Sequence, residues 1–282
     1  MFDVLAQQPL LAVAVAAVFG LLVGSFLNVV IHRLPIMMER DWEAHAAEIQ
    51  GLPAPEHEPF DLIRPRSRCP HCGHAITALE NIPVVSWLVQ RGRCKGCGNP
   101  ISARYPLVEL MTAALAALAI WQFGATSAGA AALLLTFGLV ALTGIDLDTQ
   151  LLPDSLTLPL LWAGLTLNLW SVFAPLRDAV IGAIAGYLIL WSIYWLFKLI
   201  TGKEGMGYGD FKLLAALGAW FGWQALPAII LLSSVVGAAV GIAMIVFARH
   251  GRQVPIAFGP YLAGAGLLTL YFGPTLRALY LP

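Results

Sequence analysis

Eight long apolar segments recur along the chain, and they constrain its fold more than any other feature. The first runs from Leu10 to Ile31, long enough at ~1.5 Å per residue to cross a hydrocarbon core of ~30 Å as a helix. Only 11% of the 282 residues are charged, whereas 59% are hydrophobic. A soluble domain of this length needs more surface charge. The sequence therefore predicts an all-α polytopic membrane protein with about eight transmembrane helices.

Three regions are predicted from the spacing of these segments. The other apolar segments cover residues 105–123, 128–145, 156–173, 179–200, 211–226, 228–247 and 256–272. Residues 33–104 are polar and are expected to include a short helix at 39–50. We thus expect a first transmembrane helix (1–32), a loop domain (33–104) and a seven-helix membrane domain (105–282).

The basic residues predict the orientation in the bilayer. Nine of the sixteen Lys and Arg residues lie in the loop domain, which the positive-inside rule places in the cytoplasm. Counting spans adds five to that side, Lys198, Lys203, Lys212, Arg249 and Arg252, and leaves two outside, Arg177 and Arg277. Both termini are then external. The zero net charge gives no indication of a nucleic-acid partner, and no feature indicates an oligomeric state.

Two acids stand where apolar segments meet short polar breaks. Asp146 lies in TGIDLD at 143–148, and Asp210 ends GMGYGD at 205–210. Carboxylates at membrane depth are costly and usually functional. If the two face each other they tend to share one proton, as in an aspartic peptidase, where one acid takes a proton from water and the other protonates the scissile carbonyl. The alternatives are interfacial acids without a role, or a proton relay in a carrier.

All four cysteines fall in the loop domain, as Cys69-x-x-Cys72 and Cys94-x-x-Cys97 with 21 residues between the pairs. This spacing is typical of a structural Zn²⁺ site of the ribbon type. A reducing cytoplasm disfavours disulfides, and a redox pair needs no second copy. Four thiolates leave no open position for water, so hydrolysis is assigned to the aspartates. A zinc-ribbon scaffold without chemistry is the alternative.

Several motifs occur in a fixed order along nearly the whole chain. They are GSFLNVVIHRLP at 24–35, RCPHC at 68–72, ENIPVVSWL at 80–88, RYPLVEL at 104–110, the segment 146–154 and GYGD at 207–210. Together they resemble the type IV prepilin peptidase family, also called prepilin leader peptidase/N-methyltransferase. One departure is Ala257 in IAFGP at 256–260, where the family often has proline. We expect this segment to lie away from the two acids.

The resemblance implies a bifunctional enzyme of the bacterial inner membrane. Such an enzyme cleaves the leader of type IV prepilins and type II secretion pseudopilins after a glycine, then N-methylates the new terminal residue with S-adenosylmethionine. The family's catalytic aspartates match Asp146 and Asp210, whereas Asp148 does not fall on the first of them. Glu80 and Gly92 match the part that the family links to methyl transfer. The alternatives for these two residues are a loop salt bridge and a turn.

Overall fold

The computed structural model describes residues 8–247 and 256–278 and is helical, without strands, over these ranges. Contacts within the chain divide it into an N-terminal unit, Met1–Trp121, and a C-terminal unit, Gln122–Pro282. Arg249, Arg252 and the ends of the chain lie outside the described residues, so the predicted external termini are not described.

The N-terminal unit begins with α2 (Pro9–Ile49), a helix of 41 residues. The predicted first span and the short helix expected at 39–50 are thus one element, and no helix end falls at residue 33. Composition changes there, but helix formers such as Glu39 and Ala44 continue the backbone hydrogen bonds. The helix ends where Gly51 N–H donates to Glu48 O and Leu52 N–H to Ala47 O, the pattern of a glycine cap.

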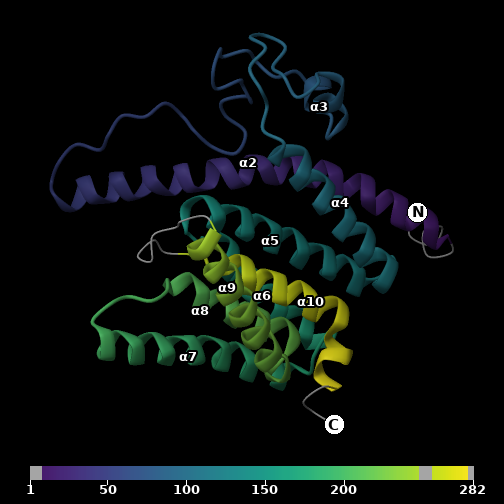
Figure 1. The fold of residues 1–282 in the computed structure, drawn as a ribbon, viewed down its shortest axis with the longest axis vertical. Coiled ribbons are helices and arrows are strands. Elements are labelled where there is room, and N and C mark those ends of the chain that lie inside the picture. Colours follow the sequence, from purple (N-terminus) through teal and green to yellow (C-terminus); the bar gives the residue numbers. More distant parts are fainter. Residues whose placement is uncertain (1–7, 248–255, 279–282) are drawn as a thin grey trace. The chain divides into compact units, whose positions relative to one another are not determined.

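The chain after α2 returns along this helix (Figure 1). Arg33 is buried, and its guanidinium donates to the carbonyl of Asp61 at 2.8 Å. Arg40 lies over the ring of Phe60, 4.6 Å from its centroid. These contacts tie the start of the loop to the helix. The remaining elements of the unit are η1 (Leu79–Asn81), α3 (Val85–Val89) and α4 (Arg104–Phe123).

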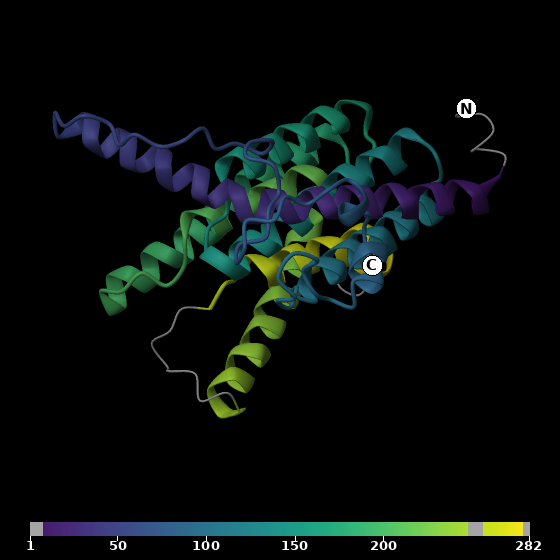
Figure 2. The ribbon, with the colours of Figure 1, turned by 90° about the horizontal axis from the view of Figure 1, so that it is seen from above.

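The C-terminal unit is a bundle arranged around a short buried helix (Figures 1 and 2). Its elements are α5 (Ser127–Thr149), α6 (Asp154–Leu167), η2 (Asn168–Trp170), α7 (Leu176–Thr201), α8 (Tyr208–Phe221), η3 (Trp223–Ala225), α9 (Leu226–Phe247) and α10 (Gly259–Ala278). From Asp210 to Phe221, α8 is buried except at Lys212, and it packs on α6, α7 and α10. Gly182 of α7 and Gly218 of α8 meet backbone to backbone, so a methyl group on either would collide with the other helix.

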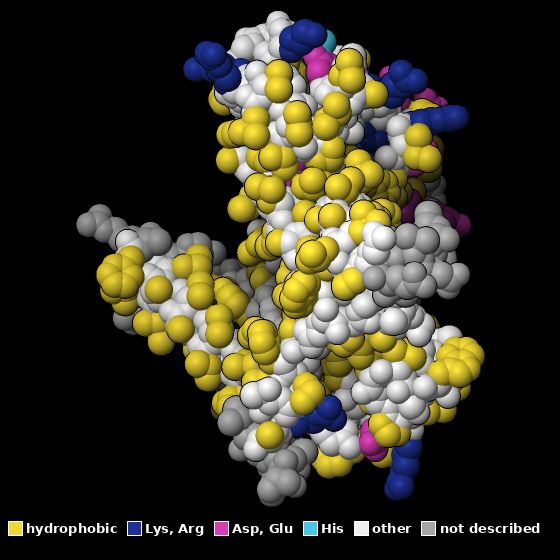
Figure 3. Space-filling view, turned by 90° about the vertical axis from the view of Figure 1, so that its right-hand side faces the viewer, with side chains coloured by type: hydrophobic (Ala, Val, Ile, Leu, Met, Phe, Trp, Pro, Cys, Tyr) yellow, Lys and Arg dark blue, Asp and Glu magenta, His cyan; other side chains and the backbone are white. Residues whose placement is uncertain are grey.

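Each predicted apolar segment contains a helix, but the count of eight spans is not confirmed. Five helices among the described residues are long and apolar enough to cross a membrane: α2, α4, α5, α7 and the stretch Trp223–Phe247. By contrast, α6 and α8 have 14 residues each, about 21 Å of helix, which is shorter than the ~30 Å core. Hydrophobic side chains cover much of the face seen in Figure 3, as expected for a membrane protein.

Asn168 closes the turn between α6 and α7 from inside the bundle. Its side chain is fully buried, and Nδ2 donates to the carbonyls of Ala219 at 2.8 Å and Trp220 at 2.9 Å. Its Oδ1 accepts from the backbone N–H of Phe173 at 3.0 Å and of Ala174 at 3.1 Å. One amide therefore satisfies backbone groups of α8 and of the loop before α7.

We expect Asn168→Ala to lower the free energy of unfolding by roughly 2–5 kcal/mol, because it leaves several buried backbone groups without partners. Reversible unfolding in mixed micelles measures the change. Asn81→Ala is the matched control, since Asn81 is exposed and its loss should change stability little. Equal stabilities of the two variants would contradict this account of the turn.

Candidate active site and metal centre

Asp146 lies in the last turn of α5 and is only 4% exposed. Its Oδ2 accepts a hydrogen bond of 2.9 Å from the backbone N–H of Gly259, the first residue of α10. The N-terminus of a helix carries a partial positive charge that stabilises a carboxylate. Fold and electrostatics thus hold this side chain in one orientation inside the C-terminal unit.

Asp210 lies in the first turn of α8 and is 6% exposed. Its carboxylate lies within the range of the charge of Asp146. Leu152 packs against Gly209, the residue before Asp210, and against Gly259 at Asp146. Lys212, two residues later, forms an ion pair with Asp154, with 2.6 Å between Nζ and Oδ1. Asp148 is exposed, unlike Asp146. The structure therefore brings Asp146 and Asp210 together and leaves Asp148 at the surface.

The segment at 256–260 does not lie away from the acids, and that expectation was wrong. A Cβ on Gly259 would stand 2.6 Å from Oδ2 of Asp146 and 3.1 Å from Cδ2 of Leu152. A Cβ on Gly209 would stand 2.7 Å from Cβ of Leu152, so this leucine lies between two glycines next to the acids. The sequence held a signal for this proximity. Gly259-Pro260 is typical of a helix start, and the count of spans puts that start on the same side of the membrane as the two acids.

The two cysteine pairs form knuckles with the same backbone geometry. In the first, Gly73 N–H donates to Cys69 O at 2.9 Å, and in the second, Gly98 N–H donates to Cys94 O at 2.8 Å. Both glycines have φ near +72°, a left-handed conformation that other residues adopt with strain. An isolated antiparallel bridge closes each knuckle. The repeat brings two pairs of thiols toward one point.

The four thiols have the arrangement of a metal centre. Their Sγ atoms all lie within 4.8 Å of one another, and Sγ–Sγ distances are 3.9 Å for Cys69–Cys97 and for Cys72–Cys94. Tetrahedral coordination with metal–sulfur bonds of ~2.3 Å requires a separation of about 3.8 Å. Backbone N–H groups of His71 and Cys72 lower the pKa of Cys69 to about 6, which favours the thiolate that binds metals. The four residues therefore fit a metal ion.

Glu80 and Gly92 both support the loop next to these knuckles. The Glu80 carboxylate accepts hydrogen bonds from the backbone N–H and the hydroxyl of Thr77, both at 2.9 Å, which lower its pKa to about 2. His74 and Lys95 also approach it, at 3.3 Å and 3.8 Å. Glu80 thereby joins residues from both knuckles.

Gly92 makes a turn against an aromatic ring. It has φ of +66°, and a Cβ there would lie 2.9 Å from the ring of Trp87. The indole Nε1 of Trp87 in turn donates to Ile101 O at 3.1 Å. A side chain at position 92 would strain the backbone and displace this ring.

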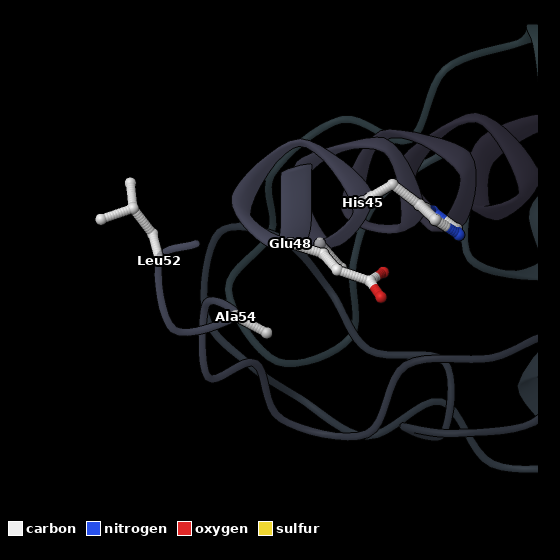
Figure 4. A pocket seen from close by; sticks show the side chains of 5 residues that line it. His45, Glu48, Leu52 and Ala54 are labelled. Carbon is white, nitrogen blue, oxygen red and sulfur yellow. The ribbon is translucent and has the colours of Figure 1, made fainter. Parts of the chain in front are cut away.

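A surface pocket lies elsewhere, at the end of α2. Figure 4 shows the side chains of His45 and Glu48 there, with Leu52 and Ala54 from the chain after the helix. Nδ1 of His45 lies 2.7 Å from Asp41 O, within its own helix. None of the predicted site residues lines this pocket, so it contributes nothing to the chemistry that the sequence indicates.

Comparison with known proteins agrees with the resemblance. The sequence model of the bacterial peptidase A24 N-terminal domain matches residues 18–123, and that of the type IV leader peptidase family matches residues 133–242. A protein of Stutzerimonas stutzeri named prepilin leader peptidase/N-methyltransferase is 59% identical over 280 residues, which are 99% of this chain and 97% of that protein. The chain belongs to the type IV leader peptidase family.

Relatives of the same name occur in other bacteria. The Aeromonas hydrophila protein is 60% identical over 97% of this chain and 95% of its own length, and the Pseudomonas aeruginosa protein is 56% identical over 100% and 97%. No solved structure matches the chain. The regions that the two family models match contain the four cysteines, Asp146 and Asp210, whereas Gly259 lies beyond these two regions, within the length that the relatives cover. The hydrogen bond to Asp146 connects Gly259 with this site.

We expect the purified protein to contain one metal ion per chain and the Cys72→Ser variant to lose it, because three thiolates and a hydroxyl bind the ion far more weakly. Elemental mass spectrometry after purification without chelators measures the content. His71→Ala is the control and should retain the ion, since the cluster consists of the four cysteines. A full metal content in Cys72→Ser would refute the assignment.

Proposed function

We propose that this chain is a bifunctional prepilin leader peptidase and N-methyltransferase in which Asp146 and Asp210 cleave the peptide bond. The observation that carries the proposal is the meeting of two buried carboxylates from separate helices, α5 and α8. The names of relatives that match nearly the full length of the chain support it. The substrates are type IV prepilins and type II secretion pseudopilins, cut after a glycine.

The geometry supplies the two roles that hydrolysis requires. Two adjacent carboxylates cannot both ionise cheaply, so they hold one proton between them. The ionised acid takes a proton from the attacking water, and the protonated acid donates to the oxygen of the scissile carbonyl. The N–H of Gly259 keeps one carboxylate fixed while the proton moves. The chain thus contains base, acid and positioning group.

In this proposal the site lies where a prepilin presents its cleavage site. A prepilin carries a basic leader in the cytoplasm and an apolar helix in the bilayer, so its scissile bond lies near the inner surface of the cytoplasmic membrane. We place both acids and the loop on this side of the bacterial inner membrane, with both termini external, on the basic-residue count. The seven-helix region at 105–282 carries the peptidase site in this proposal.

The metal at the cysteines is proposed to be structural zinc. Four thiolates at tetrahedral spacing favour Zn²⁺ over harder cations, and a closed set of ligands leaves no site for a reacting water. When bound, the ion joins the two knuckles of a loop with few buried residues of its own. Cys69, Cys72, Cys94 and Cys97 therefore order the region 33–104 instead of taking part in hydrolysis.

Methyl transfer is assigned to the same loop, with S-adenosylmethionine as donor of the methyl group. Glu80 and Gly92 are the residues proposed to serve it. Their contacts indicate that they act by shaping the loop, since Glu80 binds Thr77 and Gly92 accommodates the ring of Trp87. The methyl acceptor is the amine that cleavage exposes, so the second reaction uses the product of the first.

We expect Asp146→Asn and Asp210→Asn each to lower the rate of leader removal by about 10²–10⁴-fold, the usual contribution of a general acid or base. Mass spectrometry of a prepilin peptide, incubated in detergent with enzyme and S-adenosylmethionine, reports leader loss and methyl gain together. Asp148→Asn, at an exposed acid of the same helix, is the control and should cleave normally. Parental cleavage by either test variant would remove that acid from the site.

We expect Gly259→Ala to lower kcat for cleavage, because the added methyl group displaces the carboxylate of Asp146. Gly264→Ala in the same helix is the matched control, since nothing lies within 4 Å of a Cβ there. Both variants should methylate a peptide supplied without its leader, which verifies that they are folded. Equal cleavage by the two variants would show that the Gly259 contact does not position the acid.

A further inference from the structure

A largely apolar stretch interrupts the charged loop of the N-terminal unit. Apart from Glu80, whose carboxylate binds Thr77 within the loop, residues 79–90 contain no Asp, Glu, Lys or Arg. The stretch from η1 through α3, residues 79–89, exposes large hydrophobic side chains, with exposed fractions of 77% for Leu79, 53% for Val85, 61% for Leu88 and 77% for Val89. We call residues 79–89 the apolar segment. An exposed hydrophobic surface of this kind indicates a contact with a membrane or another protein.

The apolar segment is attached to the side of α4. The backbone N–H of Val84 donates to Oε2 of Glu109 at 2.7 Å, and Glu109 is only 7% exposed. Glu109 is the sixth residue of α4, about 7.5 Å along the axis from the start of this helix. Asn28 of α2 donates to Tyr105 O at 3.1 Å, which ties the start of α4 to the first membrane helix. The attachment point at Glu109 therefore lies more than one turn beyond the start of α4.

The backbone at Val84 fixes the direction in which α3 leaves this attachment. Val84 has φ of +60° and ψ of −49°, and Val85 N–H donates to Pro83 O across it. A β-branched residue adopts positive φ rarely and with strain, so other contacts must hold it there. The bond to Glu109 is such a contact. The exposure of α3 is thus set by the fold of the unit.

Both helices next to the apolar segment, α2 and α4, are long and apolar enough to span a membrane. Helices that lie in a bilayer interface bury their apolar face by ~5–10 Å, which is comparable with the distance of about 7.5 Å along α4 from its start to Glu109. We infer that the apolar segment, residues 79–89, inserts into the lipid interface next to α4 and holds the cysteine-bearing loop on the membrane surface.

Two basic residues beside the apolar segment suit anionic headgroups. Arg91 and Arg93 are exposed and come directly after it in the chain. Basic side chains next to an inserted apolar surface reach lipid phosphates and strengthen binding to an anionic leaflet. The partner is therefore a bilayer that contains anionic lipid. This inference needs α2 and α4 to span the bilayer, and it is independent of the aspartates and of the proposed reactions.

Photo-crosslinking of the full chain in nanodiscs of phosphatidylethanolamine and phosphatidylglycerol tests the inference. Benzoylphenylalanine replaces Leu88 or Val89, one position per protein, and mass spectrometry counts lipid adducts after illumination. Leu107, 64% exposed on α4, is the positive control. Ile49 is the matched negative control, because it is 87% exposed but stands about 27 Å beyond Ile31 along α2.

We expect lipid adducts at positions 88 and 89 to match those at position 107 and to exceed those at position 49 by about tenfold, since only an inserted side chain meets acyl chains. Helix content and metal content of each labelled protein verify its fold, and Ile82 provides a third position if one label disturbs it. Adducts at the level of position 49 would overturn the inference. So would crosslinks to a second copy, to an added prepilin peptide or to residues 122–282 in place of lipid.

Discussion

Two carboxylates in an apolar bundle impose the constraint on which the C-terminal unit depends. Ionised acids are costly at this depth unless the protein provides donors and charge stabilisation. The unit does so with backbone groups, because Gly259 N–H binds Asp146 and the N-termini of α8 and α10 lie at the acids. Gly209 and Gly259 stand beside the pair, and Leu152 packs against both glycines. The placement of the two acids and the close helix packing thus both depend on glycines, which leave room for neighbouring backbone.

Close packing also explains why a helix of 14 residues can hold one of the acids. Because α8 is buried almost throughout, its environment is protein and its length need not match the bilayer. The glycine contact between α7 and α8 removes the space that a side chain would occupy. This contact and the Asn168 amide fix the C-terminal part of α8, and Asp210 stands in the first turn of the same helix.

The N-terminal unit obtains its order in another way. Its loop buries few side chains, so the cysteine knuckles, the Glu80 contacts and the guanidinium of Arg33 replace a hydrophobic core. These polar anchors leave the hydrophobic side chains of α3 outside. A loop with polar contacts inside it and an apolar face on its surface is suited to the boundary between water and lipid.

Hydrophobic runs, cysteine spacing and the order of motifs are local properties that can be read without a fold. From them the sequence alone predicted a helical membrane protein, the clustering of the four cysteines, the pairing of Asp146 with Asp210, and the family. Composition could not reveal that α2 continues to Ile49, because a helix passes from lipid to water without changing its hydrogen bonds. Length of an apolar run also could not distinguish a span from the buried α8, since both avoid water. The contact of Gly259 with Asp146 joins residues 113 positions apart. Gly259-Pro260 indicates a helix start on the same membrane face as the acids, but only the tertiary structure decided which side chain its N–H meets, because a backbone N–H carries no sequence signal of its partner.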